Sequence, residues 1–183
     1  MTSTQKTSFL DPKSIIRQLD IKKDEVIAFL GSGSGYFAIE IAKLIGREGY
    51  IYAIDILKNK IDSFESLSRT NQIFNYSTHQ INIENQTKLE AIFKNRKPDK
   101  IFLVSVLSEN KQKAPVIKNS TAVLKPGGKI IIIEWKNKNL KIVPPKNMLV
   151  DKEKLKSYLK WLNLKFKKEL DAGRYHWGFV FTK

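Results

Sequence analysis

Short apolar runs alternate with amphipathic segments along most of the chain. The runs at 26–30, 100–106 and 129–135 have no polar face, which is typical of strands buried on both sides of a sheet. Between them, apolar residues recur at the spacing of a helix. The pattern predicts strands at 26–30, 50–54, 77–83, 100–106, 129–135, 164–170 and 177–181, and helices at 12–19, 37–45, 58–68, 89–93, within 111–123 and at 151–162.

This alternation predicts an α/β fold, with a mostly parallel sheet and helices on both of its faces. Asp171-Ala172-Gly173 joins the last two strands closely enough for a hairpin, so we expect the sheet to be mixed at that edge. No repeat or linker interrupts the 183 residues, a length suited to one core. We therefore predict a single domain over 1–183, with a helical lead-in at 1–24 and the sheet core at 25–183.

A glycine-rich turn lies between the first predicted strand and the helix after it. In Gly31-Ser32-Gly33-Ser34-Gly35 the backbone can pass close to a ligand, beside the free N–H groups of a helix start. Asp55, at the end of the next strand, is placed to accept hydrogen bonds from both hydroxyls of a ribose. Strand, turn, helix, strand and terminal acid together predict a site for an adenosine-containing cofactor.

The spacing of the glycines distinguishes between cofactors. A nicotinamide site has its third glycine or alanine five positions after the first, where this chain has Tyr36. The spacing G-x-G-x-G instead resembles motif I of the class I S-adenosylmethionine-dependent methyltransferases. Residues 50–56 look like that family's second strand with its ribose-binding acid, and 123–129 look like its turn before the fifth strand. Residues 143–145 and 171–181 are similar to the tail of a small branch related to quinone-biosynthesis (type 11-like) methyltransferases.

The resemblance, which covers 9–183, implies a Rossmann-like sheet of seven strands in which only the last is antiparallel. S-adenosyl-L-methionine would lie across the carboxyl ends of the first strands, as ligands do in open α/β sheets. The resemblance places the glycine turn at the methionine part, Asp55 at the ribose and Ile56 at the adenine. The residues that it implies for cofactor binding are Gly31, Ser32, Gly33, Gly35, Asp55, Ile56, Asn82 and Ile83 beside the adenine, and Ser105 near the donor methyl group.

Two positions depart from the family pattern. Phe29 stands where the family usually has an acid two residues before its first glycine, and Asn82 replaces the usual acid beside the adenine. Asn82 can still accept a hydrogen bond from an exocyclic amine through its side-chain oxygen. Loss of a hydrogen bond to a charged group costs about 1.5 to 3 kcal/mol, or roughly ten- to a hundredfold in affinity. A degenerate domain that serves as a non-catalytic adaptor is therefore one alternative.

Methyl transfer from a sulfonium depends mainly on alignment of the acceptor, the methyl carbon and the sulfur, and some acceptors also need a base. His176, Glu134 and Tyr175 are the candidate catalytic residues, because they lie at or near the ends of the last strands. Histidine can exchange a proton near neutral pH, but aromatic packing beside Trp177 is the alternative for His176. Glu134 ends a very apolar strand, and solvent exposure is its alternative to a place in the pocket.

The net charge of +15 belongs to the second half of the chain. Residues 1–68 carry nine basic and nine acidic side chains, 69–135 carry eleven and five, and 136–183 carry thirteen and four. One interpretation is a surface that attracts RNA or another polyanion. The other is codon bias, because Lys outnumbers Arg 28 to 5 and lysine lacks the fork that grips phosphate in two places. We expect any polyanion contact to be nonspecific.

Composition also limits whether we expect a metal site or a membrane span. Cysteine is absent and only His79 and His176 could offer imidazole, so we expect no metal site. No apolar run approaches the roughly 20 residues of a membrane span, and residues 1–6 are polar, so we expect no membrane span and a cytoplasmic location.

The leading hypothesis is an S-adenosylmethionine-dependent methyltransferase that acts on a small molecule. It follows from the resemblance to a small-molecule branch and from the absence of a separate recognition domain. The first alternative is methylation of RNA or of a ribosome-associated protein, which the basic second half suggests. The second is the non-catalytic adaptor suggested by Phe29 and Asn82.

Overall fold

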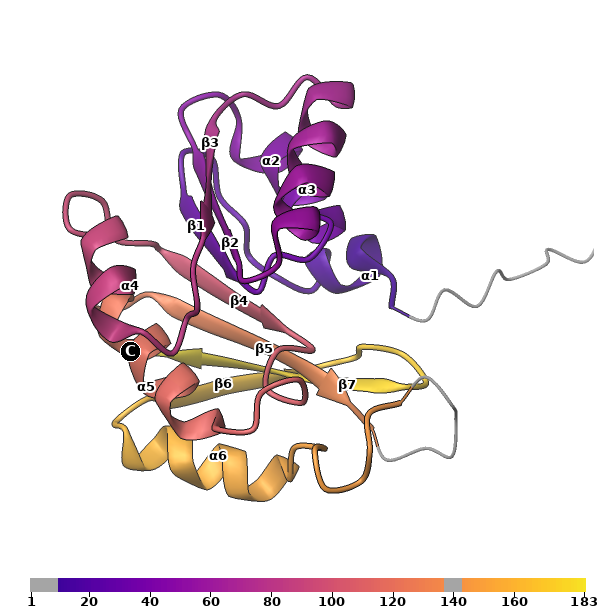
Figure 1. The fold of residues 1–183 in the computed structure, drawn as a ribbon. Coiled ribbons are helices and arrows are strands. Elements are labelled where there is room, and N and C mark those ends of the chain that lie inside the picture. Colours follow the sequence, from indigo (N-terminus) through magenta and orange to yellow (C-terminus); the bar gives the residue numbers. More distant parts are fainter. Residues whose placement is uncertain (1–9, 137–142) are drawn as a thin grey trace, which may run out of the picture.

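Strands and helices alternate along the chain until the last two strands, which follow one another directly, and the strands form one seven-stranded sheet (Figure 1). The computed structural model describes residues 10–136 and 143–183. The strands are β1 (Val26–Leu30), β2 (Tyr50–Asp55), β3 (Tyr76–Gln80), β4 (Lys100–Val104), β5 (Lys129–Trp135), β6 (Lys165–Leu170) and β7 (His176–Thr182). The helices are α1 (Pro12–Ile16), α2 (Tyr36–Ile45), α3 (Lys58–Thr70), α4 (Gln86–Ile92), α5 (Lys113–Val123) and α6 (Lys152–Trp161).

The strand order is β3-β2-β1-β4-β5-β7-β6. β7 pairs antiparallel with β5 and with β6, and every other adjacent pair is parallel. β7 is therefore the one antiparallel strand of the described sheet. This confirms the expected α/β class, the seven strands and the antiparallel last strand.

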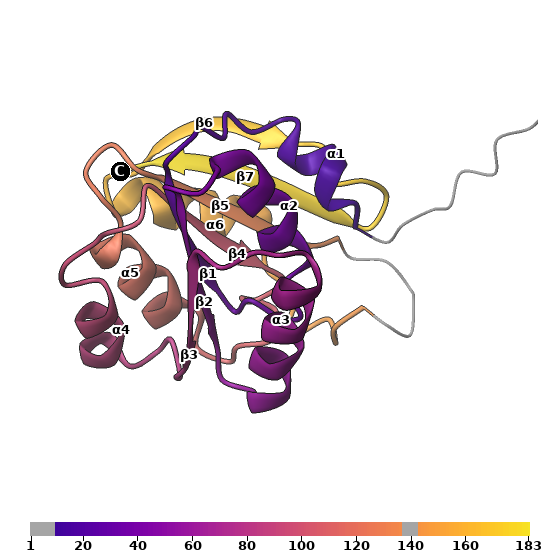
Figure 2. The ribbon, with the colours of Figure 1, turned by 90° about the horizontal axis from the view of Figure 1, so that it is seen from above.

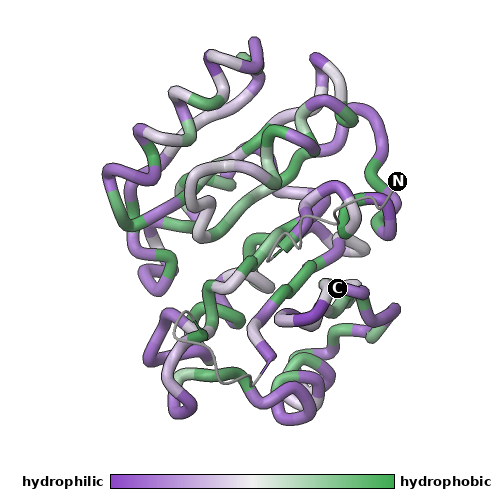
Figure 3. The backbone as a smooth tube through the Cα atoms, turned by 90° about the vertical axis from the view of Figure 1, so that its right-hand side faces the viewer, coloured by the Kyte–Doolittle hydropathy of each residue, from purple (hydrophilic) through white to green (hydrophobic). Residues whose placement is uncertain are grey.

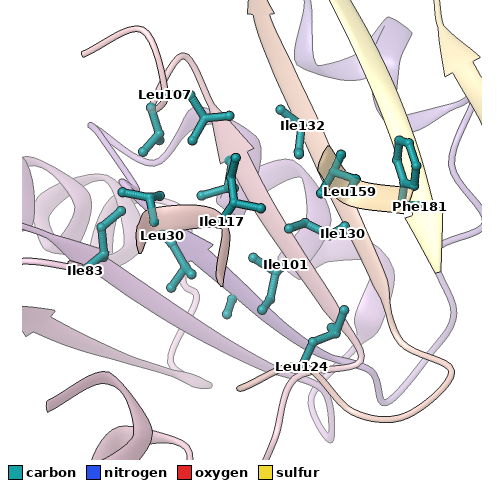
Figure 4. Packing of buried hydrophobic residues seen from close by; sticks show 14 of the residues in the cluster. Leu30, Ile83, Ile101, Leu107, Ile117, Leu124, Ile130, Ile132, Leu159 and Phe181 are labelled. Atoms are coloured by element: carbon teal, nitrogen blue, oxygen red, sulfur yellow. The ribbon is translucent and has the colours of Figure 1, made fainter. Parts of the chain in front are cut away.

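Each face of the sheet has its own apolar core. Helices α1, α2 and α3 cover one face, and α4, α5 and α6 cover the other (Figures 1 and 2). Residues alternate between the two cores along a strand, so Ile130 and Ile132 of β5 lie in one and Ile131 and Ile133 in the other. Figure 4 shows the α5–α6 side, with Ile117 and Leu159 packed over the strands. The hydropathy colouring in Figure 3 shows the same layering, with apolar strands inside and polar helix faces outside.

Several predicted boundaries are wrong by a few residues, and the local backbone and capping contacts explain two of them. β4 ends at Val104 rather than at 106, because Ser105 has a φ of 58° that turns the chain out of the sheet. α4 begins at Gln86 rather than at 89, because the side chain of Asn85 accepts the N–H of Lys88 and caps the helix. α1 ends at Ile16 rather than at 19. The first nine residues of the predicted lead-in lie outside the described part of the chain.

The topology fixes where a ligand can bind. β1 lies between β2 and β4, so the chain leaves the carboxyl end of β1 toward one side of the sheet and later returns on the other. Such a switch point leaves a crevice outside the carboxyl ends of the strands. The glycine turn follows β1 at this crevice.

Within the two described ranges, no helix is both long enough and apolar enough to cross a membrane.

Candidate functional site

The glycine turn after β1 is held by the end of β2. The carbonyl oxygen of Ile54 accepts the N–H groups of Gly31 and Ser32, each at 2.8 Å. The next amide, Gly33 N–H, donates to Oδ2 of Asp55 at 2.9 Å. Three consecutive amides of the turn are thus fixed by two consecutive residues of the neighbouring strand.

Asp55 also organises the turn that follows its own strand. Its second oxygen, Oδ1, accepts the N–H of Leu57 at 3.0 Å, and only 9% of the residue is exposed. An ionised carboxylate offers about four lone-pair sites. Two are used by these amides, so Asp55 keeps acceptor capacity for a ligand that enters the crevice.

The three glycines of the turn are required for different reasons. A Cβ atom on Gly31 would lie 2.5 Å from Val106 Cγ2, and one on Gly35 would lie 2.5 Å from Phe64 Cδ2, so these two positions allow close packing. A Cβ on Gly33 would meet nothing within 4 Å. All three have positive φ, which glycine adopts without strain. Gly33 alone therefore combines a left-handed backbone with open space on the ligand side.

A cavity of about 260 Å³ lies on one side of the glycine turn. Ile56 and Leu57 border it and are about half exposed, at 56% and 52%, an unusual exposure for large apolar side chains next to a buried acid. Such surfaces suit a planar ring. The complete lining consists of Gly31, Gly33, Asp55, Ile56, Leu57, Lys60, Ile81, Asn82, Ile83, Val104, Val106, Glu109 and Asn110.

A second cavity, of about 440 Å³, lies across the turn and shares Gly31, Gly33 and Val104 with the first. Its lining is apolar apart from the turn itself and Tyr36, and it includes Phe29, which is 3% exposed and stacks on Phe102 with ring centroids 4.9 Å apart. The hydroxyl oxygen of Ser32 is buried here and makes no hydrogen bond to a described residue. The remaining lining residues are Leu10, Pro12, Ser34, Gly35, Tyr36 and Phe37.

Buried polar groups hold the outer border of the smaller cavity. The side-chain amide of Asn119 on α5 donates to the carbonyl oxygens of Ile83 and Glu84, at 3.1 and 2.9 Å. Asn82 is exposed, and its Oδ1 accepts the N–H of Glu84 at 2.9 Å. The oxygen expected to face an adenine amine thus already has one partner, although a carbonyl oxygen can accept a second hydrogen bond.

The loop after β4 forms the other border, and Glu134 holds it in place. Glu134 is fully buried, and its Oε1 accepts the N–H of Leu107 at 2.7 Å. The same loop places Val106 against Gly31 and brings Glu109 and Asn110 to the smaller cavity. Glu134 lines neither cavity, so its geometry is that of a positioning residue.

The three candidate catalytic residues do not gather at one point. In the β5–β7 ladder Glu134 lies opposite Trp177, whereas the next pair, Trp135 and His176, faces the other side of the sheet. His176 is 2% exposed and packs on Trp135 with ring centroids 4.1 Å apart. Tyr175 is half-buried, with the guanidinium of Arg174 5.6 Å from its ring centroid. Neither His176 nor Tyr175 lines the two cavities.

Eight of the nine predicted cofactor residues line one or both cavities. Ser105 does not, although its neighbours Val104 and Val106 do. The structure adds Lys60 to this lining. It also places there Glu109, a polar candidate after the fourth predicted strand, and burial together with the charge of Asp55 raises the pKa of the Glu109 carboxyl. Glu109 could be suspected from its place after an apolar strand, but nothing in the sequence marks Lys60. In the described ranges, no three His, Asp or Glu side chains lie close enough to hold a metal ion.

Burial raises the pKa of Glu134 to about 7, and hydrogen bonds from Ser108 and Leu107 offset only part of this effect. The folded state therefore holds the proton more tightly than the unfolded chain does. Protonation of Glu134 therefore makes its full contribution to the free energy of unfolding below about pH 4.5. This contribution, about 3 kcal/mol, is lost as the pH rises to about 7.

We predict that Glu134→Gln removes this pH dependence, because the amide is neutral and still accepts from Leu107. At about pH 8 the variant should be at least as stable as the wild type, and near about pH 5 its advantage should disappear. Urea unfolding at both pH values measures this, with Glu153→Gln on the exposed side of α6 as the matched control. Parallel pH profiles for the wild type and Glu134→Gln would contradict the prediction.

The comparisons with known proteins agree with this geometry. A model of a methyltransferase domain matches residues 21–173. No curated protein sequence matches the chain. Among solved structures, a SAM-dependent methyltransferase from Aquifex aeolicus superimposes with a TM-score of 0.79 at 17% identity, covering 95% of this chain and 90% of that one. A putative type 11 methyltransferase from Sulfolobus solfataricus gives 0.70 at 22% identity, with coverage of 96% and 94%.

Fibrillarin from Aeropyrum pernix, solved with natively bound S-adenosyl-L-methionine, gives a TM-score of 0.70 at 17% identity over 92% of this chain and 72% of that one. At these identities the structural similarity establishes the fold. The match of the family model over most of the sequence goes further. The chain belongs to the methyltransferase domain family and has the Rossmann-like fold of the class I S-adenosylmethionine-dependent enzymes.

Proposed function

We propose that the chain binds S-adenosylmethionine in the crevice around the glycine turn and transfers its methyl group to a small-molecule acceptor. The observation that carries the proposal is the setting of Asp55. It is buried, fixed by two backbone amides and still able to accept, at a cavity bordered by exposed apolar side chains. This is the combination that a ribose with an attached adenine requires.

The other residues of the crevice fit the rest of the cofactor. Ile56 and Leu57 can lie against the adenine, and Asn82 and Ile83 can border it. The open space at Gly33 lets the cofactor pass close to the backbone, and the buried hydroxyl of Ser32 can bond to its methionine part. When bound, S-adenosylmethionine supplies an activated methyl group, and the chain positions it.

The charges of the crevice bear on a cationic cofactor. The larger cavity, on the side proposed for the methionine part, is lined by Phe29 and has no Asp or Glu among its described lining residues. The smaller cavity is lined by both Asp55 and Glu109. A sulfonium near these groups gains electrostatic stabilisation in a partly buried setting. Glu109 thus supplies negative charge from a different loop than the family pattern suggests.

The larger cavity supports a small acceptor. It is bordered by Leu10, Phe29 and Val104 and has a volume in the range of small-molecule sites. His176, Tyr175 and Glu134 lie outside both cavities, so we propose that catalysis rests on alignment, with Glu134 acting through the loop after β4. An apolar acceptor in this cavity would agree with the resemblance of the chain to the type 11-like branch, which is related to quinone-biosynthesis methyltransferases.

Methylation of RNA is the second candidate. The solved structures that resemble this chain include fibrillarins, one of them described as a pre-rRNA processing protein, and this similarity supports RNA as an alternative acceptor. The observation that bears on it is the lysine-rich edge strand β6, where Lys165 and Lys167 are exposed. Lysines on an exposed edge also prevent pairing with other chains, so they do not by themselves indicate RNA.

We predict that Asp55→Asn weakens binding of S-adenosylmethionine or S-adenosylhomocysteine about tenfold or more, because one charged acceptor is lost. Isothermal titration measures the affinity. Asp62→Asn on α3, an exposed carboxylate paired with Lys58, is the control and should leave it unchanged. Wild-type protein that shows neither heat nor a thermal shift at millimolar cofactor would contradict the methyltransferase proposal and favour the adaptor.

We predict that Gly33→Val abolishes cofactor binding and leaves the protein folded. The valine would enter the open space that the cofactor needs, and its positive φ should cost about 1–2 kcal/mol. Gly127→Val is the matched control, because Gly127 also has a positive φ and open space but lies in the turn before β5, at the opposite end of the parallel strands. The two variants should lose similar stability, and only Gly33→Val should lose binding. Equal affinity of both variants would show that the turn is merely structural.

We predict that the chain binds RNA at low salt, with little sequence preference, and loses most of this binding near physiological ionic strength. Contacts from dispersed lysines release counterions and are therefore steeply salt-dependent. Filter binding over a salt series with unrelated RNA sequences measures this. Tight binding to one RNA at physiological salt would place RNA methylation ahead of the small-molecule proposal.

A further inference from the structure

A third cavity, of about 380 Å³, lies between α5 and α6 and is separate from the cofactor crevice. Its apolar surface comes from both helices and from the loop after β4, through Ile117, Leu155 and Leu107. Tyr158 on α6 adds an aromatic wall, and the ring of Trp161 stacks behind it with centroids 5.7 Å apart. Figure 4 shows Leu107 and Ile117 on this side of the sheet.

Two lysines line the same cavity. Lys113 begins α5 and donates one hydrogen bond to the carbonyl oxygen of Asn110 at 3.1 Å, and Lys154 lies in the first turn of α6 and is exposed. Neither forms an ion pair with a described carboxylate. Residues 1–9 and 137–142 contain no Asp or Glu, so their side chains cannot supply a carboxylate either.

Asp151 is the one acidic residue of the lining, and the helix already engages it. Its Oδ1 accepts the N–H groups of Glu153 and Lys154, at 3.1 and 3.0 Å, and so caps α6. The positive helix end and the two amides offset its charge. The cavity thus combines an apolar floor with two ammonium groups that lack a counter-charge.

We propose that this cavity is a second binding site, which takes a small apolar anion: an aromatic or branched aliphatic body with one carboxylate, sulfonate or phosphate head. The body would pack on Leu107, Ile117 and Tyr158, and the head would bind Lys113 and Lys154. The match is one of charge complementarity, because an anion relieves the uncompensated ammonium groups while its body covers apolar surface. The site is additional to the proposed function and does not depend on it.

The site is connected to the cofactor crevice through one loop. Leu107 lines the third cavity, whereas Val106 and Asn110 on either side of it line the cofactor cavity. Glu134 holds the loop between them through Leu107 N–H. An anion in the third cavity therefore contacts the segment that borders the cofactor.

Fluorescence titration of the full chain with anilinonaphthalene sulfonate tests the proposal, because this dye is an apolar anion that becomes bright in apolar surroundings. We expect saturable binding to one site. N-phenylnaphthylamine has the same rings without the sulfonate and should bind about tenfold more weakly or worse. The double variant Lys113→Gln, Lys154→Gln should lose this preference for the charged dye.

The matched control is the double variant Lys118→Gln, Lys160→Gln, which removes one exposed lysine from each of the same helices outside the cavity and should keep the preference. Ala114→Phe should exclude both dyes, since Ala114 lines the cavity at an exposed position where a larger side chain leaves the fold intact, as a thermal melt will verify. Absence of dye binding, equal preference in the two double variants, or strictly competitive displacement of the dye by S-adenosylhomocysteine, which would place the dye in the cofactor crevice, would each overturn the proposal.

Discussion

The carboxylate of Asp55 is the constraint on which the site depends. One oxygen accepts from Gly33 and the other from Leu57, so a single side chain fixes the turn after β1 and the turn after β2. The carbonyl oxygen of the preceding residue, Ile54, holds Gly31 and Ser32 in the same way. Because β1 and β2 pair in parallel up to Leu30 and Ile54, the position of the crevice follows directly from the register of the sheet.

Packing then transmits this arrangement to the loop after β4. Val106 fits against Gly31 only because the glycine has no Cβ, and Glu134 anchors the next residue, Leu107, from beneath. Burial of a carboxylate costs free energy unless the group is protonated or well hydrogen-bonded. Its raised pKa shows that burial outweighs the hydrogen bonds it accepts, so the loop is held by a group that titrates in the physiological range.

The sequence predicted the elements well, and it pointed to residues around the glycine turn that the structure does bring together, because both depend on local signals. Apolar runs, glycine spacing and a strand-terminal acid are all visible in one dimension, and they identified Gly33, Asp55 and Ile56. The catalytic candidates depended on proximity in space, which the sequence does not reveal. His176 and Glu134 are both near strand ends, but the pleat directs them to opposite faces of the sheet. The role of Asn119, which reaches across from a helix to the loop after β3, has no sequence signal either.

The packing of Phe29 explains why an acid would not fit at the position where the chain departs from the family pattern. Its ring stacks on Phe102, and such pairs contribute about 0.5–1.5 kcal/mol, so an acid here would lose packing and be buried among apolar groups. The carboxylates lie instead on the other side of the turn, on Asp55 and Glu109, where burial and then the charge of Asp55 raise the pKa of Glu109. In the proposed complex a sulfonium relieves this repulsion, whereas the neutral thioether of the demethylated product does not. The two carboxylates therefore favour the cofactor over its product by charge, and transfer of the methyl group weakens the interaction that held the donor.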